Sequence, residues 1–478
     1  MNGFSTIRIN YLGGIVSPGE LRDLLIALKI CEVRHIRFGL RQQLIFHLSY
    51  LHELTFKQRM EVLGIDYYID TNPHPNVVSS YVSEEVFQQG NWLSEGIYKD
   101  IFDTIDFNPR LKINISDSGQ SFTPFFSGHI NFISSDVPNF WYLYVRKPKS
   151  NDLQVYEKLV FSNEIGAISK HLQEALLNEE EVIFDQLPTI ISAEKKNELK
   201  LPKFTLPYYE GFNRYGSKTW LGIYKRSELF DINFLIDLCS LCLETKVGEI
   251  CLTPWKSIIV KNIKEDDRKK WSALLAKFDI NVRHAANELN WQIEDASEEG
   301  LKLKQKLIKY FNERDLRTFG ICLGVKTLEK TEVFASIMVK KHRKFLVNLY
   351  DITYTTDYDP NGRNVAHYAK NLPGFMLAEK LRQSILLFNE HIAEMSLLED
   401  VLNEPMGSED VKQNSHEVFQ CQSCLTIYDE TYGDEQQGIA PGVSFDYLPI
   451  SYGCSICGSK RDNFKAVDSH EMVLQFNA

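Results

Sequence analysis

Four of the chain's nine cysteines stand in two Cys-x-x-Cys pairs near its C-terminal end, Cys421 with Cys424 and Cys454 with Cys457. Paired cysteines at this spacing let two thiolates converge on one ion, and two such pairs close a tetrahedral site that suits iron or zinc. A gap of 29 residues separates the pairs, whereas common zinc sites leave roughly 15 to 20. The spacing predicts a metal site and leaves the choice between iron and zinc open.

Three further cysteines, Cys239, Cys242 and Cys251, form a Cys-x2-Cys-x8-Cys set. The first two lie in an apolar segment with helical spacing, where cysteine behaves as a small buried hydrophobe. No fourth ligand is evident beside them, so we expect these side chains in the core. No glycine-rich loop follows a predicted strand, and we therefore expect no dinucleotide site in this chain.

Charge and hydropathy narrow the function classes. The chain of 478 residues has a net charge of −11, which argues against the concentrated basic face that nucleic-acid binding requires. Residues 417–478 hold nine acidic and three basic side chains and so carry −6 of that charge, which predicts a partner with a basic docking surface. We see neither a signal peptide nor an apolar run of the roughly 18 residues that span a membrane. The expected compartment is the cytoplasm.

The two cysteine pairs are joined and followed by short motifs in a fixed order. These are Ile427–Asp429 (IYD), Gly433–Asp434 (GD), Gly438–Gly442 (GIAPG), Phe445, Leu448–Pro449 and Asp462–Phe464 (DNF). Over about residues 417–468 this pattern resembles the rubredoxin family, one-electron carriers with a single iron on four cysteines. The resemblance implies one iron ion on Cys421, Cys424, Cys454 and Cys457. Leu425 stands where the family usually has glycine, and Tyr452 where it usually has tryptophan.

The remaining 400 residues must position this module or give it a role. Residues 399–416 are acidic, contain Pro405 and Gly407, and read as a linker. Before them a unit of strand, helix, strand and strand is predicted twice, with Gly14–Leu21 aligned without gaps on Gly222–Leu229. A period of about 210 residues is too long for a solenoid and indicates duplicated domains.

Several motifs of residues 5–398 resemble the ferredoxin-like half-domains of the nitrite/sulfite reductase family. They are Leu12–Gly14 (LGG), Ile36–Gln42 (IRFGLRQ), Leu252–Lys256 (LTPWK), Asn108–Ser116 (NPRLKINIS) and Ser127–Ile133 (SGHINFI). In that family the half-domains surround siroheme coupled to a 4Fe–4S cluster. Arg41 and Gln42 match the family's Arg-Gln pair, in which the arginine faces the tetrapyrrole and the substrate. Arg110 and Lys112 match a basic pair that binds the anionic substrate, while Pro75 replaces a third base. These bases also fit ordinary surface charges or structural ion pairs.

The family's cluster ligands, a Cys-x5-Cys and a Cys-x3-Cys pair, have no counterpart in this sequence. The matching segments, Asn281–Asp295 and Val333–Phe345, contain no cysteine. Because a 4Fe–4S cluster is held by thiolates, we expect no cluster here and no six-electron reduction of the family's kind.

We therefore predict an α+β chain with two siroheme-reductase-like repeats, residues 1–205 and 206–398, a linker at 399–416 and a metal-stapled domain at 417–478. The expected protein is an oxidoreductase component that carries one electron at a time in nitrite or sulfite assimilation, with a reductase-like docking body. Its expected partner is a redox protein with a basic docking surface, either a reductase or an NAD(P)H-dependent rubredoxin reductase. Arg41, Arg110 and Lys112 are candidates for an anion or tetrapyrrole pocket. Two alternatives remain open, a siroheme reductase with its own rubredoxin arm and a non-catalytic assembly factor with structural zinc.

Overall fold

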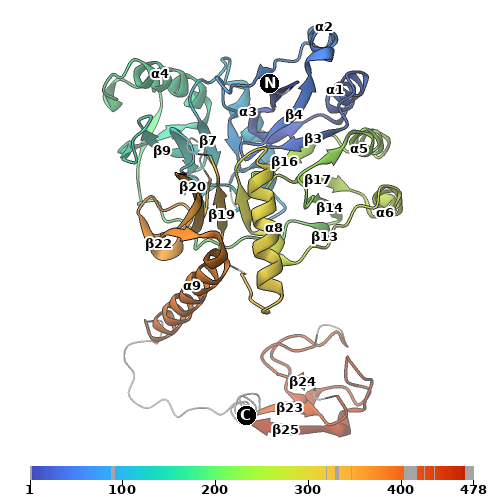
Figure 1. Cartoon of the computed structure of the whole chain (residues 1–478). Helices are drawn as coiled ribbons and strands as arrows, with labels where there is room; N and C mark the ends of the chain where they lie inside the picture. The colour runs from blue at the N-terminus through green and yellow to red at the C-terminus, as the bar shows by residue number, and fades with distance from the viewer. Residues whose placement is uncertain are drawn as a thin grey trace. The chain divides into compact units, whose positions relative to one another are not determined.

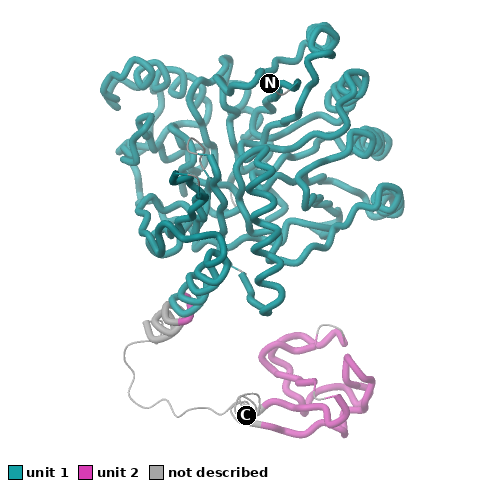
Figure 2. The backbone as a smooth tube through the Cα atoms, viewed as in Figure 1, with its two compact units in different colours: residues 1–391 teal, residues 392–478 magenta. Residues whose placement is uncertain are grey.

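The computed structural model of the chain describes residues 3–87, 92–318, 320–328, 333–345, 347–402, 417–424, 426–434 and 437–468. The chain divides into two compact units, Met1–His391 and Ile392–Ala478 (Figure 2). The predicted α+β class is confirmed. Among the described helices, none is long and apolar enough to cross a membrane.

The predicted unit of strand, helix, strand and strand is present twice in the first compact unit (Figure 1). In sequence order its elements are β1 (Phe4–Asn10), α1 (Pro18–Ile30), β3 (His35–Phe38) and β4 (Gln43–Ser49), then β14 (Lys218–Ile223), α5 (Ile232–Glu244), β16 (Ile250–Leu252) and β17 (Ile258–Ile263). Helices α2 (Glu53–Leu63) and α6 (Arg268–Lys277) follow the two copies. Each helix buries an apolar stripe, such as Leu24 and Leu28 of α1.

The two copies exchange their edge strands. The first sheet has the order β15-β3-β4-β1-β5 and the second β13-β14-β17-β16-β2. The strands not yet bounded are β2 (Ile15–Val16), β5 (Tyr68–Ile69), β13 (Gly211–Tyr215) and β15 (Phe230–Asp231). Thus β2 of the first copy closes the second sheet, and β15 of the second copy closes the first. A single apolar core contains side chains of both copies, so the two repeats form one domain.

The structural register of the repeat differs from the gapless alignment of Gly14 with Gly222. Ser17 is the N-cap of α1 and Asp231 the N-cap of α5, and these residues are 214 positions apart. Gln42 and Lys256 share the same spacing, and both have positive φ, 55° and 56°, in matching turns. The alignment offset of 208 was therefore wrong by six residues, because two similar Gly-Ile starts outweighed the turn signals.

Two further sheets share one topology. In one, β7 and β8 pair in parallel and β8 and β9 antiparallel; in the other, β19 and β20 pair in parallel and β20 and β21 antiparallel. Their orders are β12-β11-β9-β8-β7-β6, with β10 beside β9, and β18-β19-β20-β21-β22. The first contains β6 (Val78–Ser79), β7 (Ile113–Ser116), β8 (Ile130–Ser134), β9 (Phe140–Arg146), β10 (Leu153–Val155), β11 (Lys158–Phe161) and β12 (Ser192–Glu194). The other contains β18 (Trp291–Ile293), β19 (Leu323–Lys326), β20 (Ile337–Lys344), β21 (Val347–Thr355) and β22 (Val365–Pro373).

Helices accompany these sheets at corresponding places in the chain. They are α3 (Glu95–Asp103) and α4 (Ile165–Leu177) in the first half, then α7 (Ala286–Leu289), α8 (Glu298–Asn312) and α9 (Gly374–Leu402) in the second. The end of α9 overlaps the predicted linker, so residues 399–402 are helical, while residues 403–416 lie outside the described residues.

The C-terminal unit is a small sheet with a compact aromatic core. Its strands are β23 (Glu417–Cys421), β24 (Ile427–Tyr428) and β25 (Phe464–Asp468), with β23 in the centre. Tyr428, Phe445, Leu448 and Tyr452 are buried together, with Phe464 packed against them. Leu425 lies outside the described residues.

Candidate metal centre and anion cavity

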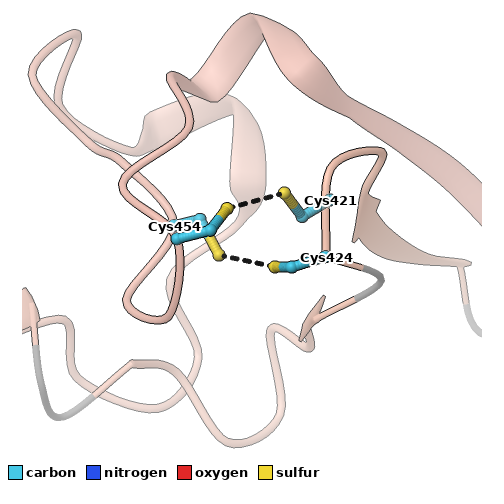
Figure 3. A group of neighbouring side chains, drawn as sticks. Cys421, Cys424 and Cys454 are labelled. Atoms are coloured by element: carbon cyan, nitrogen blue, oxygen red, sulfur yellow. Dashed lines mark hydrogen bonds between the residues drawn. The ribbon is translucent and has the colours of Figure 1, made fainter.

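The four paired cysteines come together at one end of the C-terminal unit. Cys421 ends β23, Cys424 lies in the turn toward β24, and Cys454 and Cys457 lie in a second turn. The Sγ atoms of all four lie within 4.8 Å of one another. Figure 3 shows the sulfurs of Cys421 and Cys424 pointing toward the turn that carries Cys454. In the described part of the chain, this is the one group of three or more His, Cys, Asp or Glu side chains placed to hold a metal ion.

The sulfur spacing fits a single tetrahedral ion. The Sγ atoms of Cys421 and Cys457 are 3.6 Å apart, and those of Cys424 and Cys454 are 3.5 Å apart. With metal–sulfur bonds of about 2.3 Å, the edges of a thiolate tetrahedron measure about 3.8 Å. Sulfurs crowded this closely repel one another once ionised, so the donor set calls for a cation between them.

Hydrogen bonds prepare two of the sulfurs for ionisation. Hydrogen bonds from the Ser459 side chain and backbone lower the pKa of Cys457 to about 6. Burial acts to raise the pKa of Cys421, but backbone hydrogen bonds from Cys424 and Ser423 outweigh it and lower that pKa. For Cys424, hydrogen bonds from Thr426 lower the pKa, yet the nearby sulfurs of Cys457 and Cys454 help to raise it to about 11. A cation that binds all four thiolates removes this conflict.

The four ligands divide into two buried and two accessible sulfurs. Cys421 and Cys454 are 0% and 2% exposed, whereas Cys424 is half-buried and Cys457 is exposed. The second cysteine of each pair therefore lies closer to the surface of the unit than the first. The aromatic core covers the other side, where the Tyr452 hydroxyl donates to Oδ2 of Asp434 at 2.9 Å.

The body contains a cavity of about 740 Å³, within the usual range for a ligand pocket. The three predicted bases Arg41, Arg110 and Lys112 all line it, although they are up to 71 residues apart in the sequence. Eight of its described lining residues are arginine or lysine, against two carboxylates, Glu294 and Asp295. The wall therefore favours an anionic ligand.

The predicted residues differ in what their side chains do. The Arg41 guanidinium donates to the carbonyl oxygens of Asn76 and Ile113 at 2.7 and 2.9 Å, so it also anchors its own turn to the neighbouring sheet. Gln42 is fully buried and binds Ser79 and Leu252 through its amide, and it holds the two halves together without lining the cavity. Arg110 is exposed at the rim. Pro75 is buried in the cavity wall.

Other cavity residues were not anticipated from the sequence. Lys326 of β19, Lys340 of β20 and Arg363 of the loop before β22 add positive charge from the last sheet. Nη1 of Arg8 and Nε2 of Gln43 are buried in the wall and find no hydrogen-bond partner in the part of the chain that the structure describes. The only available signal was strand alternation, which does not tell which face of a strand meets a cavity.

Buried ion pairs brace the wall near the two carboxylates. Lys256 is 3% exposed, and its Nζ lies 2.9 Å from Oε2 of Glu228 and 3.9 Å from Oδ1 of Asp295. The same Asp295 oxygen accepts the backbone N–H of Leu40 at 2.9 Å. Lys256 and Asp295 thereby fix the turn that carries Arg41.

The wall does not fit an iron–sulfur cluster. The segment Asn281–Asp295 supplies the cavity with an amide and two carboxylates, and Val333–Phe345 supplies apolar side chains, a hydroxyl, a thioether and the ammonium group of Lys340. No cysteine is among the cavity's described lining residues. The body's cysteines lie in apolar cores instead. Burial raises the pKa of Cys239 and that of Cys251 to about 12, which disfavours the thiolate that a cluster needs.

Comparison with known proteins places the two units separately. Residues 418–464 match the rubredoxin family. The high molecular weight rubredoxin of Moorella thermoacetica is 43% identical over 49 residues, which are 10% of this chain and 21% of that protein. Rubredoxin 4 of Rhodococcus sp. (strain Q15) is 34% identical over 55 residues, which are 12% of this chain and 92% of that protein.

The body has a structural relative. The solved structure of the Mycobacterium tuberculosis NirA protein superposes with a TM-score of 0.56 at 13% identity, covering 85% of this chain and 82% of that one. At this identity the likeness concerns the fold. The body therefore shares the overall fold of that protein.

Proposed function

The chain belongs to the rubredoxin family through its C-terminal unit, and on that basis we propose that it carries single electrons on one iron ion held by Cys421, Cys424, Cys454 and Cys457. The observation that carries this proposal is the convergence of four Sγ atoms within 4.8 Å of one another. Iron bound to four thiolates exchanges one electron between two oxidation states without a change of ligands. The protein orients the sulfurs, donates hydrogen bonds to them and leaves two of them open to a partner.

We further propose that the carrier serves nitrite or sulfite assimilation and that the body acts as its reductase-like platform. The NirA-like fold supports this assignment. Because the cavity wall does not fit a cluster, we derive no reduction step through a siroheme–cluster unit. The electron partner is a redox protein with a basic docking surface, since the C-terminal residues carry a net −6.

Metal analysis of the purified full chain tests the carrier proposal. We expect close to one iron per chain, the visible absorption of a ferric thiolate site, reversible one-electron reduction and no acid-labile sulfide. Stoichiometric zinc in a colourless, redox-inactive protein would contradict the proposal and favour the assembly-factor alternative. Several additional irons with sulfide would show that body cysteines ligate a cluster.

The cavity supports a second proposal, that the body binds an anionic ligand. Its excess of basic side chains favours a ligand with oxygen acceptors, as do the buried nitrogens of Arg8 and Gln43, which have no hydrogen-bond partner among the described residues. Titration of the full chain with sulfite, and separately with a polycarboxylate porphyrin, tests this. Arg110→Ala should weaken binding about tenfold or more, because hydrogen bonds to charged groups contribute about 1.5–3 kcal/mol. The control is Arg59→Ala, an exposed arginine on α2 outside the cavity, and equal effects of both variants would refute the site.

A further inference from the structure

Two side-chain hydroxyls lie against the metal-binding sulfurs at equivalent places in the two turns. Oγ1 of Thr426 is 3.1 Å from Sγ of Cys424, and Oγ of Ser459 is 3.1 Å from Sγ of Cys457. Each hydroxyl belongs to the residue two positions after the second cysteine of its pair. The two turns therefore repeat one arrangement, although their sequences differ around the cysteines.

The backbone holds both hydroxyls in place. The N–H of Cys421 donates to the carbonyl oxygen of Thr426 at 2.8 Å, and the N–H of Cys454 donates to that of Ser459 at 2.8 Å. In each turn the first, buried cysteine thus anchors the residue that reaches the second, accessible cysteine. These bonds fix the backbone of Thr426 and Ser459 beside the second cysteine of each pair.

The two hydroxyls contact the two accessible ligands, Cys424 and Cys457. Within the described residues, no side-chain hydroxyl is within hydrogen-bond distance of the sulfurs of Cys421 or Cys454, which are buried. Cys424 and Cys457, through which an electron reaches the surface, each have one. A thiolate bound to a metal has no proton, so the hydroxyl must be the donor in both contacts.

We propose that Thr426 and Ser459 are tuning residues that raise the reduction potential of the four-cysteine site. Reduction adds one electron, and part of the added negative charge resides on the sulfurs. A hydroxyl that donates to a sulfur stabilises the reduced state more than the oxidised state, and hydrogen bonds to sulfur are among the factors that set the potential of iron–thiolate centres. The inference rests on the proposed iron site and adds two residues to it that are not ligands.

The size of the effect follows from ordinary hydrogen-bond energies. A hydrogen bond to a charged group is up to twice as strong as a neutral one, and only the difference between the two redox states affects the potential. We expect removal of one hydroxyl to shift the one-electron exchange equilibrium up to about tenfold toward the oxidised form, which corresponds to 59 mV for a one-electron couple. Removal of both should give nearly the sum, since the hydroxyls contact different sulfurs.

Redox titration of the full chain followed by its visible spectrum tests the proposal. The variants are Thr426→Val, which keeps the side-chain shape, Ser459→Ala and the double variant. Thr426→Ser and Ser459→Thr keep the hydroxyl and should keep the wild-type midpoint. Ser451→Ala removes an exposed hydroxyl of the same unit and should leave the potential unchanged.

The outcomes separate this inference from the carrier proposal. Iron-loaded variants whose midpoint falls in Thr426→Val and Ser459→Ala but not in the hydroxyl-keeping pair support tuning. Iron-loaded variants with the wild-type midpoint would overturn it, while leaving the carrier function intact. If a hydroxyl-free variant binds no iron, the hydroxyl-keeping variant at that position decides, because a midpoint far from wild type there contradicts the proposal. A wild-type protein without iron or a redox couple would refute the carrier function itself.

Discussion

The chain uses the Cys-x-x-Cys spacing in two opposite ways. Cys239 and Cys242 lie on α5, where both side chains are 0% exposed and burial raises the pKa of both thiols. Cys421 and Cys424 have the same spacing, but Cys421 ends β23 and Cys424 lies in the turn that follows it, and both of their sulfurs face the sulfurs of two more cysteines. On a helix the two side chains point into an apolar core, whereas the turn points both at one place. The backbone around a motif, rather than its spacing, decides between packing and metal binding.

The same contrast separates the two compact units in how they are stabilised. The body has extended apolar cores that join helices and strands of both repeats. Among its described residues, the C-terminal unit has one small cluster of buried side chains, Tyr428, Phe445, Leu448 and Tyr452, and one further buried hydrophobic residue besides its cysteines, Val418. A unit of about 50 residues buries too little apolar surface to fold firmly alone, and a bound metal supplies the difference.

The largest expected effect comes from removing a metal ligand. Cys424→Ser and Cys457→Ser should each lose the iron and unfold the C-terminal unit, because binding a structural metal is coupled to folding and contributes on the order of 10 kcal/mol. The body should keep its own unfolding transition. Metal analysis, the visible spectrum and calorimetric unfolding of the full chain measure the three effects together.

The matched control for this loss is the Cys-x-x-Cys pair on α5, Cys239 and Cys242. Cys242→Ala deletes a buried sulfur from the α5 core, so it should destabilise the body by about 1 kcal/mol or more through the cavity it leaves. Its iron content should equal that of the wild type. Iron retained with a reversible couple in Cys424→Ser, or lost in Cys242→Ala, would reverse the roles assigned to the two pairs.

The body differs from the C-terminal unit in how it holds a buried polar group. It contains a buried lysine, Lys304, which is held by a hydrogen bond, whereas the buried sulfurs of the C-terminal unit are arranged to bind a metal. Lys304 of α8 is 3% exposed, its Nζ lies 2.7 Å from the Tyr224 hydroxyl, and burial lowers its pKa to about 8. Between that pH and the ordinary lysine value of 10.5, the unfolded chain keeps a proton on Lys304 that the folded chain has lost. Stability therefore rises with pH in this window, by about 3 kcal/mol for this residue.

Lys304→Met tests the sign and size of this rise in stability with pH. Denaturant unfolding of the body at several pH values should show the wild type gaining about 3 kcal/mol relative to the variant between pH 8 and 10.5. Lys302→Met, at an exposed position on the same helix, should leave the pH dependence of the wild type unchanged. A constant difference between the wild type and Lys304→Met across this range would mean that Lys304 titrates like an ordinary lysine.

Local spacing explains what could be predicted from the sequence. Three predictions depend on residues that are close together in the chain. They are the four paired cysteines of the metal site, the core position of Cys239 and Cys242, and the repeated unit of strand, helix, strand and strand. Arg41, Arg110 and Lys112 were grouped by resemblance, and the structure places them on one cavity. Titration of the full chain with sulfite or a porphyrin tests whether they bind a ligand.

Contacts between distant segments explain what could not be predicted. The exchange of β2 and β15 between the two repeats depends on pairings such as Val16 with Ile250, which no local pattern encodes. Lys340 and Arg363 line the cavity from the last sheet and the loop before its final strand. Their position depends on how two sheets face each other. The repeat register was wrong for the same reason, since the matching turns at Gln42 and Lys256 are recognisable only by their backbone conformation.

The smallest expected effect concerns how the acidic unit meets its partner. The net −6 of the C-terminal residues attracts a basic surface through a screening length of roughly 10 Å at 0.1 M salt. Electron delivery should therefore slow by about tenfold between low and high ionic strength, with the loss in the association rate. Stopped-flow reduction of the full chain by its reductase at several salt concentrations measures this, and an unchanged rate would exclude electrostatic docking.

Cutting the chain between Asn403 and Asn414 then identifies the partner. If the body accepts the electron, the tether supplies a high effective concentration, and cleavage should slow delivery strongly at low protein concentration. If a separate reductase or carrier is the partner, the freed unit should react nearly as fast as the intact chain. Because cleavage leaves the four cysteines and the cavity untouched, a change in rate reports only on the connection between the two units. A rate that is insensitive to both salt and cleavage would contradict electron transfer as the reason for the fusion and favour the structural role of the four-cysteine site.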